Sequence, residues 1–305
     1  MRLRPLTRLH AAVAVIVAVA SADCARRIAP IDPATLPVPD VTLPLRPDSA
    51  RFAVIGDSGT GGAAQYRVAA RLAAAHSAFP FEFVVMTGDN LYGSETSRDY
   101  ESKFEIPYKP LLDAGVKFYA SLGNHDDTNQ TLYEPFNMGG RRFYTFRPKA
   151  DLRFFALDST YMTPEQLEWL EKELSATTSG WKIAFFHHPL YSEGRHGSEI
   201  RLRQALEPLF VEHEVDVVFV GHEHFYERIE PQKGVHYFTS GGAAKLRRGD
   251  IDRDTEFHGA GFDQGYHFML VEIVDDELHF QAITEQGRTV DAGTIARRPE
   301  DRRVE

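Results

Sequence analysis

Short apolar runs, each closed by a glycine or a polar residue, recur along the chain from residue 51 onward. The runs at residues 52–55 (Phe-Ala-Val-Ile) and 83–86 (Phe-Val-Val-Met) contain no polar residue at all. Such runs are typical of strands that are buried on both faces of a sheet. Similar but less uniform runs predict further strands at residues 117–122, 143–146, 153–157, 181–186, 215–220, 235–239, 266–273 and 278–283.

Helical patterns separate these strands in the first half of the chain. Residues 63–75 are rich in alanine and have helical spacing, and a second helix is predicted around Leu111. A third helix is predicted to begin at Thr163, which can cap it, with Pro164 at the first helical position. Its expected buried stripe consists of Leu167, Leu170 and Leu174. Strands that alternate with helices early and cluster later predict an α/β layered fold with mixed sheets.

The first residues have the pattern of a targeting segment rather than of a folded element. Arg2, Arg4 and Arg8 precede an apolar run at residues 11–20, which is too short to span a bilayer as a helix. Ala20-Ser21-Ala22 then offers the small residues of a cleavage site. We therefore interpret residues 1–22 as a secretory signal peptide, with an uncleaved N-terminal anchor as the alternative.

The rest of the chain divides by composition into a linker, a body and a tail. Residues 23–50 are rich in proline and are expected to be extended, residues 51–296 form the catalytic domain, and residues 297–305 form a charged tail. Cys24 is the only cysteine, so an intramolecular disulfide and a cysteine metal ligand are both excluded. Lipidation of Cys24 stays open, although Asp23 before it differs from the small residue that such processing usually requires.

The charge balance argues against a nucleic-acid partner. The chain has 34 lysine and arginine residues against 44 aspartate and glutamate residues, and its formal net charge is -10. An acidic surface repels a phosphate backbone at long range. A small anionic substrate can still bind at a local positive site, and a bound metal ion would provide one.

Five short motifs place oxygen and nitrogen donors just past the ends of predicted strands. They are Gly56-Asp57-Ser58-Gly59, Gly88-Asp89-Asn90-Leu91-Tyr92, Gly123-Asn124-His125-Asp126, His187-His188-Pro189 and Gly221-His222-Glu223-His224. Open α/β sheets collect their ligand sites at the carboxyl ends of the strands, where loops from several strands converge. The imidazoles of His222 and His224, two residues apart on extended backbone, can project to one side. Neutral imidazole is a common ligand of zinc and iron, so the motifs predict a metal site.

Together and in this order, the motifs resemble those of the purple acid phosphatases, a branch of the calcineurin-like metallophosphoesterases. The resemblance runs from residue 51 to about residue 242. It includes Tyr92, three positions after Asp89, which most other metallophosphoesterases lack. The resemblance implies a four-layer αββα sandwich in which two mixed sheets are flanked by helices.

The resemblance also implies a dinuclear metal centre. An iron(III) ion would be held by Asp57, Asp89, Tyr92 and His224. A second, divalent ion (iron, zinc or manganese) would be held by Asn124, His187 and His222, with Asp89 bridging the two. Carboxylate and phenolate are hard anionic donors that suit a trivalent ion, whereas neutral amide and imidazole donors suit a divalent one. His188 remains the alternative to His187, which is favoured because it directly follows the strand.

Two further histidines are implied to line the substrate pocket and to help protonate the leaving group. These are His125 and His196, the latter in the loop at residues 193–197. The expected function is that of a secreted acid phosphatase, in which a metal-bound hydroxide attacks a small phosphate monoester. The alternatives are a phosphodiesterase with the same metal pair and a secreted protein that binds metal or phosphate without turnover.

Overall fold

The computed structural model describes residues 28–298 of the chain. The predicted signal peptide, Cys24 and all but the first two residues of the predicted tail lie outside this range. No helix within residues 28–298 is both long and apolar enough to cross a membrane.

The first sheet joins three parallel strands to three antiparallel ones. Within the described residues its order is β13-β12-β11-β1-β2-β3. Strands β1, β2 and β3 run parallel, and β11, β12 and β13 continue the sheet from β1 in antiparallel fashion. The strands are β1 (Ala50–Ile55), β2 (Phe83–Met86), β3 (Lys117–Ala120), β11 (His267–Val274), β12 (Glu277–Thr284) and β13 (Thr289–Ala296).

The second sheet has the same mixed character. In the described part of the chain its order is β10-β8-β9-β7-β6-β5-β4. Strands β5, β6, β7 and β9 are parallel, whereas β4, β8 and β10 are antiparallel to their neighbours. The strands are β4 (Tyr144–Lys149), β5 (Leu152–Ala156), β6 (Trp181–Phe185), β7 (Val217–Val220), β8 (Tyr226–Gln232), β9 (Val235–Ser240) and β10 (His258–Phe262).

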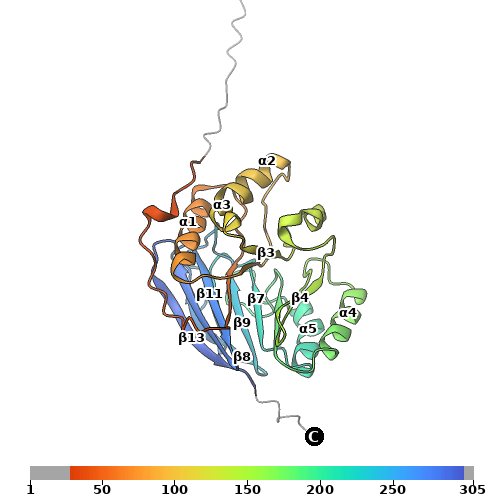
Figure 1. The fold of residues 1–305 in the computed structure, drawn as a ribbon. Coiled ribbons are helices and arrows are strands. Elements are labelled where there is room, and N and C mark those ends of the chain that lie inside the picture. Colours follow the sequence, from red (N-terminus) through yellow and green to blue (C-terminus); the bar gives the residue numbers. More distant parts are fainter. Residues whose placement is uncertain (1–27, 299–305) are drawn as a thin grey trace, which may run out of the picture.

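Helices cover the outer face of each sheet, with α1 and α3 on one side of the molecule and α4 and α5 on the other (Figure 1). They are α1 (Ala63–Ala78), α3 (Ile106–Asp113), α4 (Pro164–Ser175) and α5 (Ile200–Glu212). Shorter helical turns are η1 (Pro33–Thr35), α2 (Ser97–Tyr100), the π-helical η2 (Glu101–Glu105), η3 (Thr128–Leu132) and η4 (Glu134–Phe136). The predicted αββα sandwich is therefore confirmed.

Strand β7 shows why a central strand can be apolar throughout. Val217 and Phe219 belong to the core between the two sheets, whereas Val218 and Val220 belong to the core beneath α4 and α5. The sheets pack face to face through aromatic rings, because Phe52 of β1 contacts Phe154 of β5 and Phe219 edge to face at 5.2 and 6.0 Å. A strand between two cores has no face left for polar residues.

The proline-rich segment before β1 is fastened to the first sheet along its second half. The backbone N–H of Thr42 donates to Gln281 Oε1 at 2.9 Å, and the N–H groups of Leu45 and Arg46 donate to the Glu272 carboxylate at 2.7 and 2.6 Å. Its first half borders a cavity of about 1630 Å³ against α1 and α3. None of the predicted metal ligands lines that cavity.

Candidate metal centre

The parallel strands of both sheets deliver the predicted ligands to one edge of the sandwich. Asp57 follows β1, Asp89 follows β2 and Asn124 follows β3 in the first sheet. His187 follows β6 and His222 follows β7 in the second sheet. Because the carboxyl ends of parallel strands share an edge, residues up to 165 positions apart become hydrogen-bond partners, as the His222 N–H and Asp57 Oδ2 do at 2.8 Å.

The backbone at this edge is strained. Asp57, Asp89 and His222 have φ angles of 56°, 51° and 69°, in the left-handed region that residues with a side chain adopt at a cost. The space is equally tight: a Cβ on Gly123 would lie 2.2 Å from Asp89 Oδ1. Strain of this kind persists where surrounding structure enforces it, and it concentrates at functional sites.

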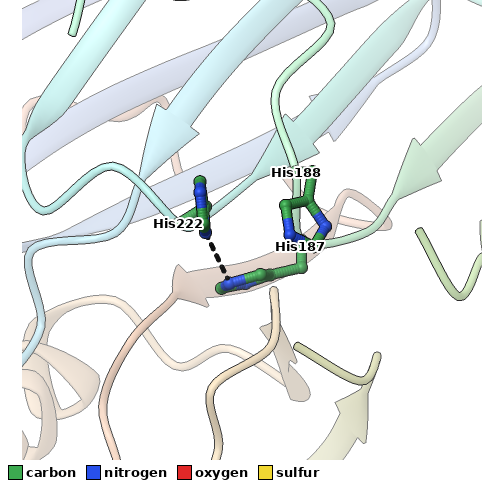
Figure 2. A group of neighbouring side chains, drawn as sticks. All are labelled: His187, His188 and His222. Atoms are coloured by element: carbon green, nitrogen blue, oxygen red, sulfur yellow. Dashed lines mark hydrogen bonds between the residues drawn. The ribbon is translucent and has the colours of Figure 1, made fainter. Parts of the chain in front are cut away.

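Asn124, His187 and His222 bring three polar atoms together. Asn124 Oδ1 lies 3.0 Å from His187 Nε2 and 3.1 Å from His222 Nδ1. The two ring nitrogens are 3.2 Å apart, the contact drawn as a dashed line in Figure 2. His187 Nδ1 lies 2.9 Å from the Thr87 carbonyl oxygen, which can only accept, so Nδ1 carries the proton and Nε2 presents a lone pair. Burial lowers the pKa of His187 and, with neighbouring histidines, the pKa of His222 to about 2. Uncharged atoms that can act as metal ligands therefore face one another here, and a bound cation would stabilise this arrangement.

Asp57, Tyr92 and His224 form a second, more acidic group. The Tyr92 hydroxyl donates to Asp57 Oδ1 at 2.9 Å, and His224 Nε2 lies 3.3 Å from that oxygen and 3.5 Å from the hydroxyl. Burial, followed by the charge of Asp89, raises the pKa of Asp57 well above its ordinary value. Burial and the two carboxylates also hold the pKa of Tyr92 far above its usual range. A highly charged cation would reverse both effects, because it favours the ionised forms.

Asp89 lies between the two groups. Its Oδ1 is 3.4 Å from His187 Nε2 and accepts a hydrogen bond from the His125 N–H at 3.0 Å. Donor atoms of Asp57, Asp89 and His187 all lie within 4.8 Å of one another. Asp89 is almost fully buried and occupies the position expected of a shared ligand.

His187 and His188 diverge from the end of β6. Their rings are nearly perpendicular, at 83° (Figure 2). His187 Nε2 lies 3.0 Å from Asn124 Oδ1 and 3.4 Å from Asp89 Oδ1. His188 Nδ1 instead lies 2.9 Å from Ser159 Oγ, although its ring remains 4.5 Å from that of His222. The arrangement favours His187 as a ligand and places His188 beside the site.

The two histidines expected at the substrate pocket both border these groups. The His196 ring lies 4.6 Å from the His222 ring, and the His125 ring lies 4.9 Å from the Tyr92 ring. Arg247 approaches His196 Nδ1 at 2.9 Å, and because a guanidinium can only donate, Nδ1 accepts and the proton of neutral His196 sits on Nε2. His125 is exposed.

Several residues that support the site were not identified from the sequence. Glu223, between the two histidines of its motif, is fully buried and accepts the His196 N–H at 3.0 Å; burial raises its pKa to about 7. Asp126 accepts backbone N–H groups from two of the three ligand-bearing loops of the first sheet, those that follow β2 and β3. These donors are Asn90 at 3.1 Å, Leu91 at 3.0 Å and Gly123 at 2.8 Å.

Comparisons with known proteins agree with this geometry. A family profile described as calcineurin-like phosphoesterase matches residues 50–226. Purple acid phosphatase 17 of Arabidopsis thaliana is 28% identical in an alignment 240 positions long that covers 67% of this chain and 71% of the plant protein. Tartrate-resistant acid phosphatase type 5 of Rattus norvegicus is 24% identical in an alignment 297 positions long that covers 82% of this chain and 91% of the rat protein.

A solved structure extends the likeness in fold. GAP50, described as the anchor in the inner membrane complex of Plasmodium, superimposes with a TM-score of 0.74 at 18% identity. The match covers 83% of this chain and 90% of that one. At this identity the likeness concerns the fold alone, so activity has to be argued from the residues at the strand ends.

Proposed function

The chain belongs to the calcineurin-like phosphoesterase family, and we propose that it is a two-metal acid phosphatase of the purple acid phosphatase type, acting on small phosphate monoesters. One observation carries the proposal. The neutral ligand atoms of Asn124, His187 and His222 lie 3.0–3.2 Å apart, and Asp89 Oδ1 lies 3.4 Å from His187 Nε2. A carboxylate oxygen of buried Asp57 lies within 4.8 Å of Asp89 and His187. Protein groups alone leave these lone pairs facing one another, whereas metal ions would use them as ligands.

The donor chemistry supports two different metals. Asp57, Asp89, Tyr92 and His224 would hold iron(III), because carboxylate and phenolate are hard anionic ligands. Asn124, His187 and His222 would hold a divalent ion, with Asp89 shared. The hydrogen bond from His187 Nδ1 to the Thr87 carbonyl supports this assignment, because a second partner of that kind orients a ligating imidazole.

When bound, such a metal pair lowers the pKa of a coordinated water and neutralises charge on the phosphoryl group, which also favours an acidic optimum. The chain itself provides the proton for the leaving group. Neutral His196 carries its proton on Nε2, because Arg247 occupies Nδ1. Its Nε2–H can therefore donate a hydrogen bond to the leaving-group oxygen. His196 in its protonated form, with Glu223 Oε2 3.4 Å from Nδ1, would transfer the proton itself, a contribution typically worth about 10²–10⁴-fold. Exposed His125, across the site beside Tyr92, would anchor the phosphate.

Secretion or a periplasmic location is also part of the proposal. It is supported by the sequence of residues 1–22, where three arginines precede a short apolar run and a small-residue cleavage pattern.

Two test substrates distinguish the proposed phosphatase from a phosphodiesterase and from a binding protein without turnover. We expect the metal-loaded protein to hydrolyse p-nitrophenyl phosphate with a kcat/KM at least about tenfold above that for bis(p-nitrophenyl) phosphate, because a dianionic monoester gains more from two cations. The initial rates of p-nitrophenolate release measure both values. A preference for the diester would indicate a phosphodiesterase. A fully metal-loaded protein that hydrolyses neither ester would be a binding protein.

A further inference from the structure

Two basic residues of the loop that follows β9 lie against the proposed iron side of the metal centre. The backbone N–H of Arg247 donates to the carbonyl oxygen of His224 at 3.1 Å, which fixes the loop to a predicted ligand. Lys245 Nζ lies 3.6 Å from the centroid of the Tyr92 ring. Both side chains are half-buried, so they belong to the wall of the site rather than to the open surface.

Both cations retain unused hydrogen-bonding capacity. Lys245 forms no ion pair with a carboxylate within residues 28–298, and its ammonium group contacts the face of the Tyr92 ring. Arg247 uses Nη1 for His196 at 2.9 Å and for Glu223 at 3.5 Å. Within the described residues its Nε and Nη2 have no partner, and neither atom is buried. The Nε–Nη2 edge is the planar fork that binds two oxygens of a phosphate.

Local charge sets this wall apart from the rest of the protein. The chain has a net charge of -10, yet Lys245 and Arg247 stand two residues apart beside the predicted ligands. The Glu223 carboxylate pairs with Arg247 and compensates part of its positive charge. The positive charge of Lys245 has no such ion pair within the described residues. Two metal ions already suffice to neutralise one scissile phosphoryl group. Additional cationic side chains beside the predicted ligands, such as Lys245 and Arg247, are suited to a second anionic group on the same substrate.

We propose that Lys245 and Arg247 form a second anion subsite, which binds a non-reacting phosphoryl group of a small substrate that carries two. The proposal rests on the proposed function and adds a preference for small substrates with a second phosphoryl group, such as bisphosphates and phosphoanhydrides. Hydrolysis forms a bond from the water oxygen to the scissile phosphorus and breaks the bond to the leaving-group oxygen. That oxygen keeps the electron pair and takes a proton, and the phosphoryl group on Lys245 and Arg247 is unchanged.

The test compares a substrate with two phosphoryl groups against one with a single group. In the metal-loaded full chain, we expect Lys245→Met to raise the KM for inorganic pyrophosphate about tenfold and the KM for p-nitrophenyl phosphate less than about twofold. Methionine keeps the length of the side chain and its packing on the Tyr92 ring. Lys245→Arg should restore most of the pyrophosphate affinity. Arg248→Met is the matched control, because Arg248 is exposed on the same loop, and it should change neither KM.

Binding without turnover gives a second readout. Methylenediphosphonate, which is not hydrolysed, should raise the Tm of the metal-loaded protein more than methylphosphonate does, and Lys245→Met should abolish the difference. Equal effects of Lys245→Met on both substrates, or none on either, would overturn the subsite and leave the phosphatase proposal intact. If the metal-loaded wild type hydrolyses neither substrate, the proposed function itself fails.

Discussion

Asn124→Ala is expected to lower kcat/KM for p-nitrophenyl phosphate by on the order of a thousandfold. Asn124 Oδ1 contacts both His187 and His222, at 3.0 and 3.1 Å. Alanine removes this oxygen and leaves the two neutral imidazoles and the shared Asp89 to hold the divalent ion. The side chain is exposed, so its removal opens no cavity in the core and should leave the fold intact.

The control for this variant is Asn129→Ala, which removes the same amide from an exposed position in η3. Steady-state kinetics should show nearly wild-type activity for Asn129→Ala, and both variants should unfold at the wild-type temperature. Full activity in Asn124→Ala would remove Asn124 from the site. Equal losses in both variants would show that the effect is not specific to the metal centre.

The second large effect is expected from a residue outside the ligand set. Asp126→Ala should lower the free energy of unfolding by about 3 kcal/mol or more. Its carboxylate accepts hydrogen bonds from the backbone of the ligand-bearing loops that follow β2 and β3, and from Gln130 Nε2 at 2.8 Å. Alanine leaves several buried N–H groups without an acceptor, and each such group costs about 1–3 kcal/mol.

Urea unfolding measures the loss of stability in Asp126→Ala, and Asp127→Ala is the matched control at the neighbouring position. Asp127 is exposed and caps η3 by accepting the Asn129 N–H at 2.8 Å, so its loss should cost only about 1 kcal/mol. Asp126→Asn, which keeps one acceptor, should fall between the two. Equal stability losses for the two alanine variants would contradict the bracing role of Asp126.

The sequence predicted most strands because the central ones lie between two cores. Strands β2 and β6 match their predicted ranges to within one residue, because β2 has no polar residue and β6 has only Lys182 among apolar residues. Strands β8, β10 and β13 were not predicted. Strand β8 contains Glu227, which is buried only because it pairs with the Glu193 N–H at 2.8 Å. Strands β10 and β13 are partly exposed and contain glycines, so they lack an apolar run.

Helix α5 was missed although its pattern was present. Leu202, Leu206 and Phe210 recur every four residues and are buried beneath the second sheet. The helix has no capping side chain at Glu199 and contains Pro208, so the signals that usually mark a helix start and interior are absent. Periodicity alone would have identified it.

At the site, ligand candidates were predictable because each belongs to a short motif at a strand end. The supporting residues were not, because their partners are distant in sequence. Arg247 contacts His196, which is 51 positions away in the sequence. Lys245, in a loop of the second sheet, contacts the ring of Tyr92, which is in a loop of the first sheet. A single lysine or arginine in a loop carries no pattern that indicates such a contact. Only the folded chain identifies these cations as neighbours of the metal centre.

The metal content of the purified, metal-loaded protein, measured together with its visible spectrum, tests the two-metal site most directly. We predict two metal ions per chain, one of them iron, and a purple charge-transfer band that Tyr92→Phe removes. Two zinc or manganese ions in a colourless protein would refute the iron assignment and keep the two-metal site. A folded, active protein that retains no more than one metal ion per chain would contradict the central claim.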